Sequence, residues 1–297
     1  MSKVLCFGSL NIDYVYDVDH FVRGGETISS LNMKIHAGGK GLNQAVALCK
    51  AGAETWFAGK TGEDKDFLIS ALKNSGVKTE LVGESQKKSG HAIIQVDPSG
   101  QNCIMIYGGA NLDITEDYID NVLNLFDNND YIILQNEINN IPYILKKASE
   151  KLIITIFNPS PLTKELNDYP LDLIDFFILN EVEGAELTGK TDEKEIINTL
   201  LARFPESKII LTLGKQGALF ADKNSIYKQG IFNVPVIDTT AAGDTFTGFF
   251  IYEYIKNSSP QNALKMAAAA SSICVSRAGA SSSIPSHLEV ENFLLSL

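Results

Sequence analysis

Cysteine and histidine are scarce in this chain of 297 residues, which holds four of each. The cysteines are far apart, three of them stand in apolar stretches, and none belongs to a C-x-x-C pair. The sequence therefore predicts reduced core side chains in a cytoplasmic protein and excludes a disulfide framework. The histidines lack the spacing of metal ligands, which argues against a zinc site. The cysteines are Cys6, Cys49, Cys103 and Cys274.

Long hydrophobic runs and an excess of basic residues are also missing. No uninterrupted apolar segment approaches the roughly 18 residues that a membrane-spanning helix needs, and the segment MSKVLCFGSL lacks the layout of a signal peptide. The formal net charge is −11, and the Lys and Arg residues are scattered. Because nucleic-acid binding needs a basic stripe, we expect neither a nucleic-acid nor a membrane partner. An anionic substrate must then be bound by local groups.

The chain alternates short apolar runs with helical patterns. The runs VLCFG, YIILQ, LIITIF, FFILN and IILTLG read as buried strands, and residues 41–50 read as a helix closed by Gly52. Continuous apolar strands separated by helices predict an α/β fold with a mostly parallel central sheet and helices on both faces. The length allows one large unit of this kind or two domains.

Polar residues follow the predicted strands at the points where they end. A single residue of this kind is typical of a turn or a helix cap. In open α/β sheets, however, ligands bind at the carboxyl ends of the strands, so the recurrence predicts a wide polar site along one edge. The residues are Asn11, Asp13, Asn136, Glu137, Asn158, Asn180, Glu183, Thr212 and Gly214.

Two segments alternate in polarity and do not fit the strand–helix rhythm. They are IDYVYDVDH and SGHAIIQVDPSGQNCIMIYGGAN, and the second reads as a hairpin turned at residues 98–100. They predict a small separate sheet. Such a sheet either covers a site as a lid or pairs with another subunit, although a plain edge hairpin fits the pattern equally well.

Two glycine-rich segments are of the kind that approaches anionic ligands. The first is HAGGKGLNQAVALCKAG, residues 36–52, in which glycines precede a helix whose free N–H groups favour electron-rich groups. The side chains of Lys40 and Asn43 would favour the same kind of ligand. A glycine-rich turn before a packed helix explains this segment as well.

The second segment is GAELTGKT, residues 184–191, which matches the phosphate-loop pattern. Because EVEGAELTG reads as a short helix ended by glycine, we do not expect Lys190 to bind phosphate.

The stretch DTTAAGDTFTGFF, residues 238–250, places small residues before an aromatic helix. The N–H groups of Ala242, Gly243 and Asp244 would converge on one point at the N-terminus of that helix, where an anion is stabilised. Asp244 is then placed to accept a proton from an attacking hydroxyl. The alternative is that Asp244 only caps the helix.

Six ordered motifs resemble the successive signatures of the ribokinase-like (pfkB) carbohydrate kinases almost end to end. The resemblance implies a single domain over residues 1–297, with the three-layer α/β/α fold of the family. It also implies the small β-sheet lid of the family, built from about residues 12–19, 30–37 and 89–108. One motif, GGKGLNQA, is especially close to the ribokinase branch. The motifs are NID, GGKGLNQA, NEVE, TLGKQG, DTTAAGDTFTG and SRAGASSSIP.

The resemblance implies ATP-dependent phosphorylation of D-ribose at its 5-hydroxyl to give D-ribose 5-phosphate. Asp244 would be the catalytic base, with Ala242 and Gly243 in the anion hole. The sugar set would be Asn11, Asp13, Gly39, Lys40, Asn43, Glu137 and Asp244. The ATP set would be Asn180, Thr212, Gly214, Gly217 and Gly243. Glu183 would organise Mg²⁺ through water, and a K⁺ loop would comprise Asp238, Thr240, Cys274, Arg277, Gly279 and Ser283.

The family also implies a homodimer joined through the lid sheet. Other activities remain open at this point: a deoxyribokinase, another sugar or nucleoside kinase of the same fold, and a non-catalytic sugar-sensing protein. Three positions depart from the family pattern. RGGE replaces a proline-containing sequence at residues 23–26, Ala267 stands where a polar residue near the adenine is common, and His91 lies in a lid strand.

Overall fold

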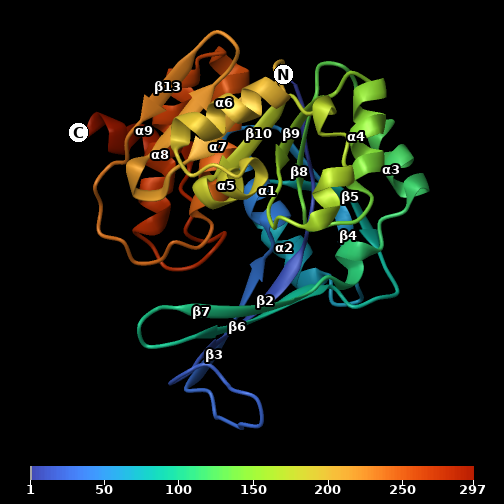
Figure 1. Ribbon diagram of the computed structural model, residues 1–297. Coiled ribbons are helices and arrows are strands. Elements are labelled where there is room, and N and C mark those ends of the chain that lie inside the picture. The colour runs from blue at the N-terminus through green and yellow to red at the C-terminus, as the bar shows by residue number, and fades with distance from the viewer. Residues whose placement is uncertain (1) are drawn as a thin grey trace.

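Within residues 2–297, which the computed structural model describes, nine strands form a central sheet (Figure 1). Its order is β13-β12-β11-β10-β9-β8-β1-β4-β5. The strands from β11 to β5 run parallel, whereas β12 runs antiparallel to both of its neighbours, β11 and β13. The strands are β1 Val4–Phe7, β4 Thr55–Thr61, β5 Lys78–Glu84, β8 Tyr131–Gln135, β9 Ile154–Asn158, β10 Phe176–Asn180, β11 Lys208–Thr212, β12 Ala218–Ala221 and β13 Ile226–Gln229.

Helices cover both faces of this sheet and enclose two cores. Side chains alternate along β1, so that Val4 and Cys6 pack toward α1, α2, α7, α8 and α9, whereas Leu5 and Phe7 pack toward α3, α4 and α6. This arrangement confirms the predicted three-layer α/β/α class. The helices are α1 Lys40–Ala51, α2 Asp66–Asn74, α3 Glu116–Leu123, α4 Ile141–Glu150, α5 Glu181–Thr188, α6 Glu193–Arg203, α7 Ala242–Asn257, α8 Pro260–Val275 and α9 His287–Leu295. None of these helices in residues 2–297 is long and apolar enough to cross a bilayer.

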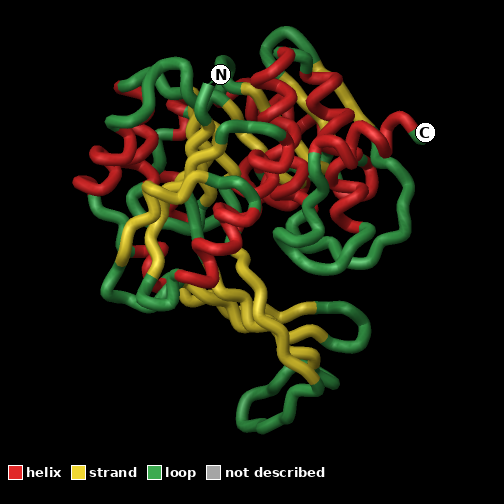
Figure 2. The backbone as a smooth tube through the Cα atoms, turned by 180° about the vertical axis from the view of Figure 1, so that it is seen from behind, coloured by secondary structure: helices red, strands yellow, loops and turns green. Residues whose placement is uncertain are grey.

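A small sheet of four strands projects from this body (Figures 1 and 2). Its order is β3-β2-β6-β7, and β6 and β7 form the predicted hairpin. Cys103 lies on β7, an edge strand whose side chains are all exposed, so the predicted core placement is wrong for this cysteine. Cys6 and Cys274 are buried, as expected. The strands are β2 Asn11–Asp17, β3 Asn32–Gly38, β6 Gly90–Val96 and β7 Asn102–Tyr107.

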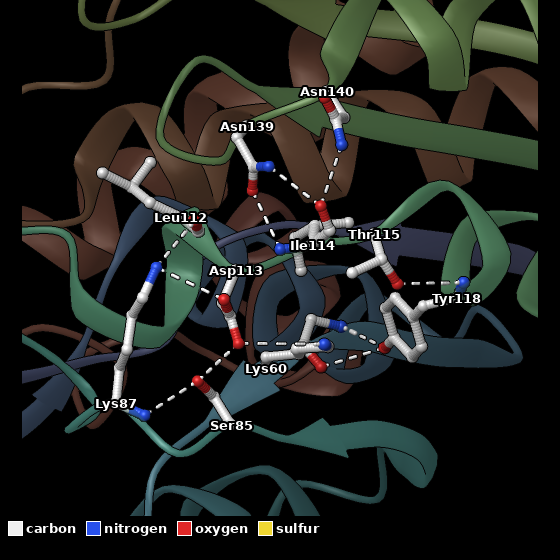
Figure 3. Close-up of polar contacts among 11 residues, drawn as sticks. Lys60, Ser85, Lys87, Leu112, Asp113, Ile114, Thr115, Tyr118, Asn139 and Asn140 are labelled. Atoms are coloured by element: carbon white, nitrogen blue, oxygen red, sulfur yellow. Dashed lines mark hydrogen bonds and ion pairs between the residues drawn. The ribbon is translucent and has the colours of Figure 1, made fainter.

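The segment between β7 and α3 fastens the small sheet to the body (Figure 3). The carboxylate of Asp113 accepts a hydrogen bond from the hydroxyl of Ser85 (2.7 Å) and forms an ion pair with Lys87 (3.3 Å). The neighbouring residue Ile114 exchanges two hydrogen bonds with the amide of Asn139, at 2.8 and 2.9 Å. These contacts fix the backbone where the hairpin re-enters the domain.

Candidate active site

Glu137 ties the loop that enters α1 to the ends of β1 and β8. Its Oε2 accepts hydrogen bonds from the Ser9 hydroxyl and from the N–H of Lys40 (3.0 Å). The Ser9 oxygen in turn accepts from the N–H of Gly41 (3.2 Å). Gly39 has a φ of 93°, and a Cβ there would lie only 3.0 Å from the Ser9 carbonyl, so the turn requires glycine. Three predicted sugar residues therefore lie together at this turn.

Strand β2 places Asn11 and Asp13 beside the same loop. A Cβ on Gly38, in the paired strand β3, would lie 2.0 Å from Oδ2 of Asp13, so the glycine leaves room for that carboxylate. The amide of Asn111 donates to Oδ1 of Asn11 (2.8 Å). The Asn11 side chain is thereby oriented with its NH₂ group available as a donor.

Asp244 is the third residue of α7 and is buried against α1. The helix begins after Ala241, whose φ of 59° is left-handed. The Asp244 carboxylate accepts hydrogen bonds from Nδ2 of Asn43 (3.1 Å) and from Nε2 of Gln44 (2.9 Å). The alternative reading of Asp244 as the N-cap is therefore wrong, because its carboxylate bonds to α1 and not to its own helix.

The start of α7 leaves two N–H groups for an anion. The N–H of Ala242 donates to the carbonyl of Thr239 (3.2 Å), so the expectation that three N–H groups converge is wrong at this residue. The N–H groups of Gly243 and Asp244 have no acceptor among residues 2–297, because the first turn of a helix lacks intrahelical partners. An anion next to this helix end would be stabilised by both groups.

Two cavities meet at this turn, and Ala242 and Gly243 line both of them. The first, of about 270 Å³, lies over Asp244. The second, of about 340 Å³, is largely apolar. Ala268 lines the second cavity, whereas Ala267 is fully buried in the core, so its departure from the family pattern does not alter the cavity wall. The first is also lined by Lys40, Asn158, Asn180, Glu183 and Thr212, and the second by Thr212, Gly214, Gly217, Ile231, Phe232 and Val236.

Burial and nearby charges shift the pKa values of several groups at the site. Burial alone lowers the pKa of Lys40, but the nearby carboxylates of Asp244, Glu137 and Glu183 outweigh it, so the pKa lies above its ordinary value. Burial, followed by the charge of Glu137, raises the pKa of Asp13 to about 7. Burial also raises the pKa of Glu137. Lys40 is thus a charged ammonium at neutral pH, the local cation that an anionic substrate requires in an acidic protein.

Asn180 and Glu183 form a capping box at the start of α5. Oδ1 of Asn180 accepts from the N–H of Glu183 (2.8 Å), and Oε2 of Glu183 accepts from the N–H of Asn180 (3.0 Å). The second oxygen of Glu183, Oε1, makes no hydrogen bond within residues 2–297, and the residue lines the cavity over Asp244. One carboxylate oxygen therefore remains for a water molecule of a bound cation.

The residues of the predicted K⁺ loop come from two segments that pack together, one before α7 and the other at the end of α8 and after it. The carboxylate of Asp238 accepts from the N–H groups of Thr240 and Gly279, both at 2.9 Å. The thiol of Cys274 lies 3.1 Å from the Ser283 hydroxyl and 3.7 Å from the Thr240 carbonyl. The structure thus brings these five residues into one cluster directly before the α7 turn.

Two basic side chains point away from the cavities. Arg277, the sixth residue of the predicted loop, directs its guanidinium to Glu289 (2.6 Å), so its side chain does not join the cluster. Lys190 lies exposed in the turn after α5, 3.9 Å from a carboxylate oxygen of Glu195. Most of GAELTGKT is helical and ends at Gly189 in a left-handed conformation, which confirms the predicted short helix closed by glycine.

Four polar side chains at the site were not predicted from the sequence. All four are buried, and none lines the cavity over Asp244; three bond to predicted site residues, whereas Gln135 bonds to Gln44. The sequence did contain a sign of two of them. Gln135 ends an apolar strand and Gln44 lies on the buried face of a helix, and a buried amide needs hydrogen-bond partners. The four are Ser9, Gln44, Asn111 and Gln135.

Comparison with known proteins connects this site to a family. The profile described as pfkB family carbohydrate kinase matches residues 1–287. Ribokinase of Staphylococcus aureus is 35% identical over 297 residues, 96% of this chain and 97% of that protein. A bifunctional ribokinase/ribose-5-phosphate isomerase A of Fructilactobacillus sanfranciscensis is 36% identical over 306 residues, 99% of this chain and 56% of that protein.

A solved structure extends the comparison to three dimensions. Ribokinase of Arabidopsis thaliana complexed with ribose and ATP matches with a TM-score of 0.87 at 30% identity and covers 99% of both chains. The match includes the small sheet, because it spans almost the whole of each chain. The chain belongs to the pfkB family of carbohydrate kinases.

Proposed function

We propose that this chain transfers the terminal phosphoryl group of ATP to the 5-hydroxyl of D-ribose and so makes D-ribose 5-phosphate. The observation that carries this function is the buried carboxylate of Asp244, which lies between the polar side chains of α1 and the free N–H groups of α7. The related proteins named above are ribokinases, and one was solved with ribose and ATP. These relatives support the same pair of substrates.

The sugar residues offer what a free polyol needs. Oδ1 of Asn43 is buried without a hydrogen-bond partner among residues 2–297, and such an orphaned acceptor costs about 1–3 kcal/mol until a ligand donates to it. Asn11 presents an NH₂ group, whereas Asp13 and Glu137 present carboxylates. Donors and acceptors of this kind pair with sugar hydroxyls, which both donate and accept.

In the reaction, Asp244 accepts the proton of the 5-hydroxyl as that oxygen attacks the terminal phosphorus of ATP, and the bond from this phosphorus to the bridging oxygen breaks, so that ADP leaves. The N–H groups of Gly243 and Asp244 stabilise the charge of the group in transfer, and the Lys40 ammonium adds a positive charge beside it. The free oxygen of Glu183 fits a water molecule of Mg²⁺, which neutralises phosphate charge when bound with ATP.

An assay of ATP consumption with five acceptors tests the substrate. The acceptors are D-ribose, 2-deoxyribose, fructose, adenosine and pseudouridine, and we expect D-ribose to give the highest kcat/KM. A higher value for 2-deoxyribose would make the chain a deoxyribokinase. A higher value for adenosine or fructose would show that its activity is that of another kinase of the same family. Absence of turnover with all five would favour a sugar-sensing protein.

We infer that K⁺ activates the enzyme through the cluster around Asp238. The carbonyl of Thr240, which lies 3.7 Å from the Cys274 thiol, stands two residues before Ala242, so a cation in the cluster would order the start of α7. We expect the rate in K⁺ to exceed that in tetramethylammonium by about 5-fold or more, with Na⁺ a poor substitute. Equal rates in the three salts, with residual K⁺ removed, would refute this role.

We infer a homodimer joined through the small sheet. Its strands expose a run of apolar side chains that need cover, including Met33, Ile35, Ile104, Met105 and Ile106. Light scattering at micromolar concentration should give twice the mass of the chain, and Ile104→Lys should shift it toward the monomer. A monomeric mass for the unaltered protein would contradict the dimer.

The affinity for ribose should depend on pH through Asp13. Burial raises the pKa of this carboxylate to about 7, so below that pH it is largely protonated and loses its role as a charged acceptor. The Kd for ribose, measured by calorimetry without ATP, should therefore fall as pH rises from 6 to 8. Asp13→Asn should bind more weakly with no such dependence. A pH-independent Kd in the unaltered protein would disprove the assignment.

A further inference from the structure

A chain of buried amide side chains leads from the central sheet to Asp244. Gln135, the last residue of β8, donates from Nε2 to Oε1 of Gln44 (2.7 Å), and Nε2 of Gln44 donates to Oδ1 of Asp244 (2.9 Å). Both glutamines are fully buried. Gln44 also donates to Oδ1 of Asn158 at 3.3 Å. The function proposed above gives no role to either glutamine, yet every polar atom of Gln44 is engaged in this chain.

The donor pattern fixes the direction in which the Gln44 amide faces. Because its Oε1 accepts from Gln135, both hydrogens of its Nε2 are available for Asp244 and Asn158. The reversed amide would place an acceptor oxygen against the Asp244 carboxylate. Gln135 therefore acts on Asp244 only through Gln44, by holding one of the two amide orientations.

Donors from α1 hold both oxygens of the Asp244 carboxylate. Gln44 donates to Oδ1, and Asn43 donates to Oδ2 (3.1 Å), so the plane of the carboxylate is fixed. A carboxylate oxygen accepts more than one hydrogen bond, which leaves capacity for a substrate hydroxyl at the cavity. The titratable groups that face this carboxylate are Lys40 of α1, Glu137 after β8, Glu183 of α5 and Cys6 of β1.

We propose that Gln44, held in place by Gln135, is a positioning residue that orients the Asp244 carboxylate toward the hydroxyl of the substrate. This inference rests on the proposed function, in which Asp244 is the base. A neutral amide suits the task, because it donates to a carboxylate without taking up the proton that the carboxylate must accept. A carboxyl group of the same shape would instead share a proton with Asp244.

The isosteric variant Gln44→Glu tests this role. We expect kcat at neutral pH to fall by about tenfold to a hundredfold, because a misdirected group at the reacting centre loses on this order. The acid limb of the kcat profile should move to higher pH, since a second carboxyl beside Asp244 raises the pH at which the base is free. The KM for ribose and the Kd for ATP should change little, because Gln44 does not line the cavities.

Gln135→Met should lower kcat less and leave the acid limb in place, because it frees the Gln44 amide without adding a charge. The matched control is Thr155→Val, which removes an equally buried hydroxyl that donates to the Leu173 carbonyl (2.8 Å) at the other end of β9. Thr155→Val should lower the melting temperature but leave kcat and its pH profile unchanged.

The outcomes separate this inference from the proposed function. An unaltered kcat and pH profile in Gln44→Glu, beside an inactive Asp244→Asn, would overturn the positioning role and leave the function standing. An active Asp244→Asn would overturn the function itself. If Gln44→Glu fails to fold, Gln135→Met decides, since a folded Gln135→Met with the unaltered kcat would also overturn the role.

Discussion

Replacing Asp244 by asparagine is expected to lower kcat by about a hundredfold to ten-thousandfold, because the amide keeps the shape of the side chain but cannot accept the proton of the hydroxyl. The Kd for ATP should change little, since the N–H groups at the start of α7 belong to the backbone and remain in place. Steady-state kinetics and calorimetry with ATP measure the two quantities. Melting temperature serves as the check on folding.

Lys190→Ala is the matched comparison for that variant. Lys190 occupies the phosphate-binding position of GAELTGKT, yet it lies exposed in the turn after α5 and only approaches the carboxylate of Glu195. Exposed pairs of this kind contribute about 0–1 kcal/mol, so we expect neither activity nor stability to change appreciably. An inactive Lys190→Ala beside an active Asp244→Asn would overturn the mechanism.

Features that depend on neighbouring residues could be predicted from the sequence. The glycine after α1 has a φ of 114° and ends the helix, as its position in the pattern indicated. The strands with continuous apolar runs were predicted because parallel strands are buried on both faces. Polar residues after those strands predicted a site at one edge of the sheet, because the carboxyl ends of parallel strands meet there.

Features that depend on distant residues could not be predicted in this way. The edge strand β13, with sequence IYKQ, is partly exposed and lacks an apolar run, and β4 mixes polar with apolar residues. The bond from Ala242 to Thr239 requires Ala241 in a left-handed conformation, which the identity of an alanine does not indicate. The contact between Gln44 and Asp244 joins α1 to α7 and exists only once the helices pack.

Gly243→Ala is expected to lower kcat by on the order of a hundredfold while leaving stability equal or higher. Gly243 lines both cavities, and a Cβ at this residue would meet no protein atom within 4 Å. The added methyl group would therefore occupy space that the transferred group needs beside the free N–H groups, and small displacements at the reacting centre cost about this much. Alanine in a helical turn should stabilise the fold by about 0.4–1 kcal/mol.

The control for this variant is Gly24→Ala, at a loop residue where a Cβ also meets nothing within 4 Å but which lies outside both cavities. It should leave kcat, KM and ATP affinity unchanged. Because Gly243→Ala should melt at the same or a higher temperature, a loss of activity cannot be assigned to unfolding. Full activity in a folded Gly243→Ala would mean that the phosphoryl group does not pass this turn, and the anion site would then have to lie elsewhere along the sheet edge.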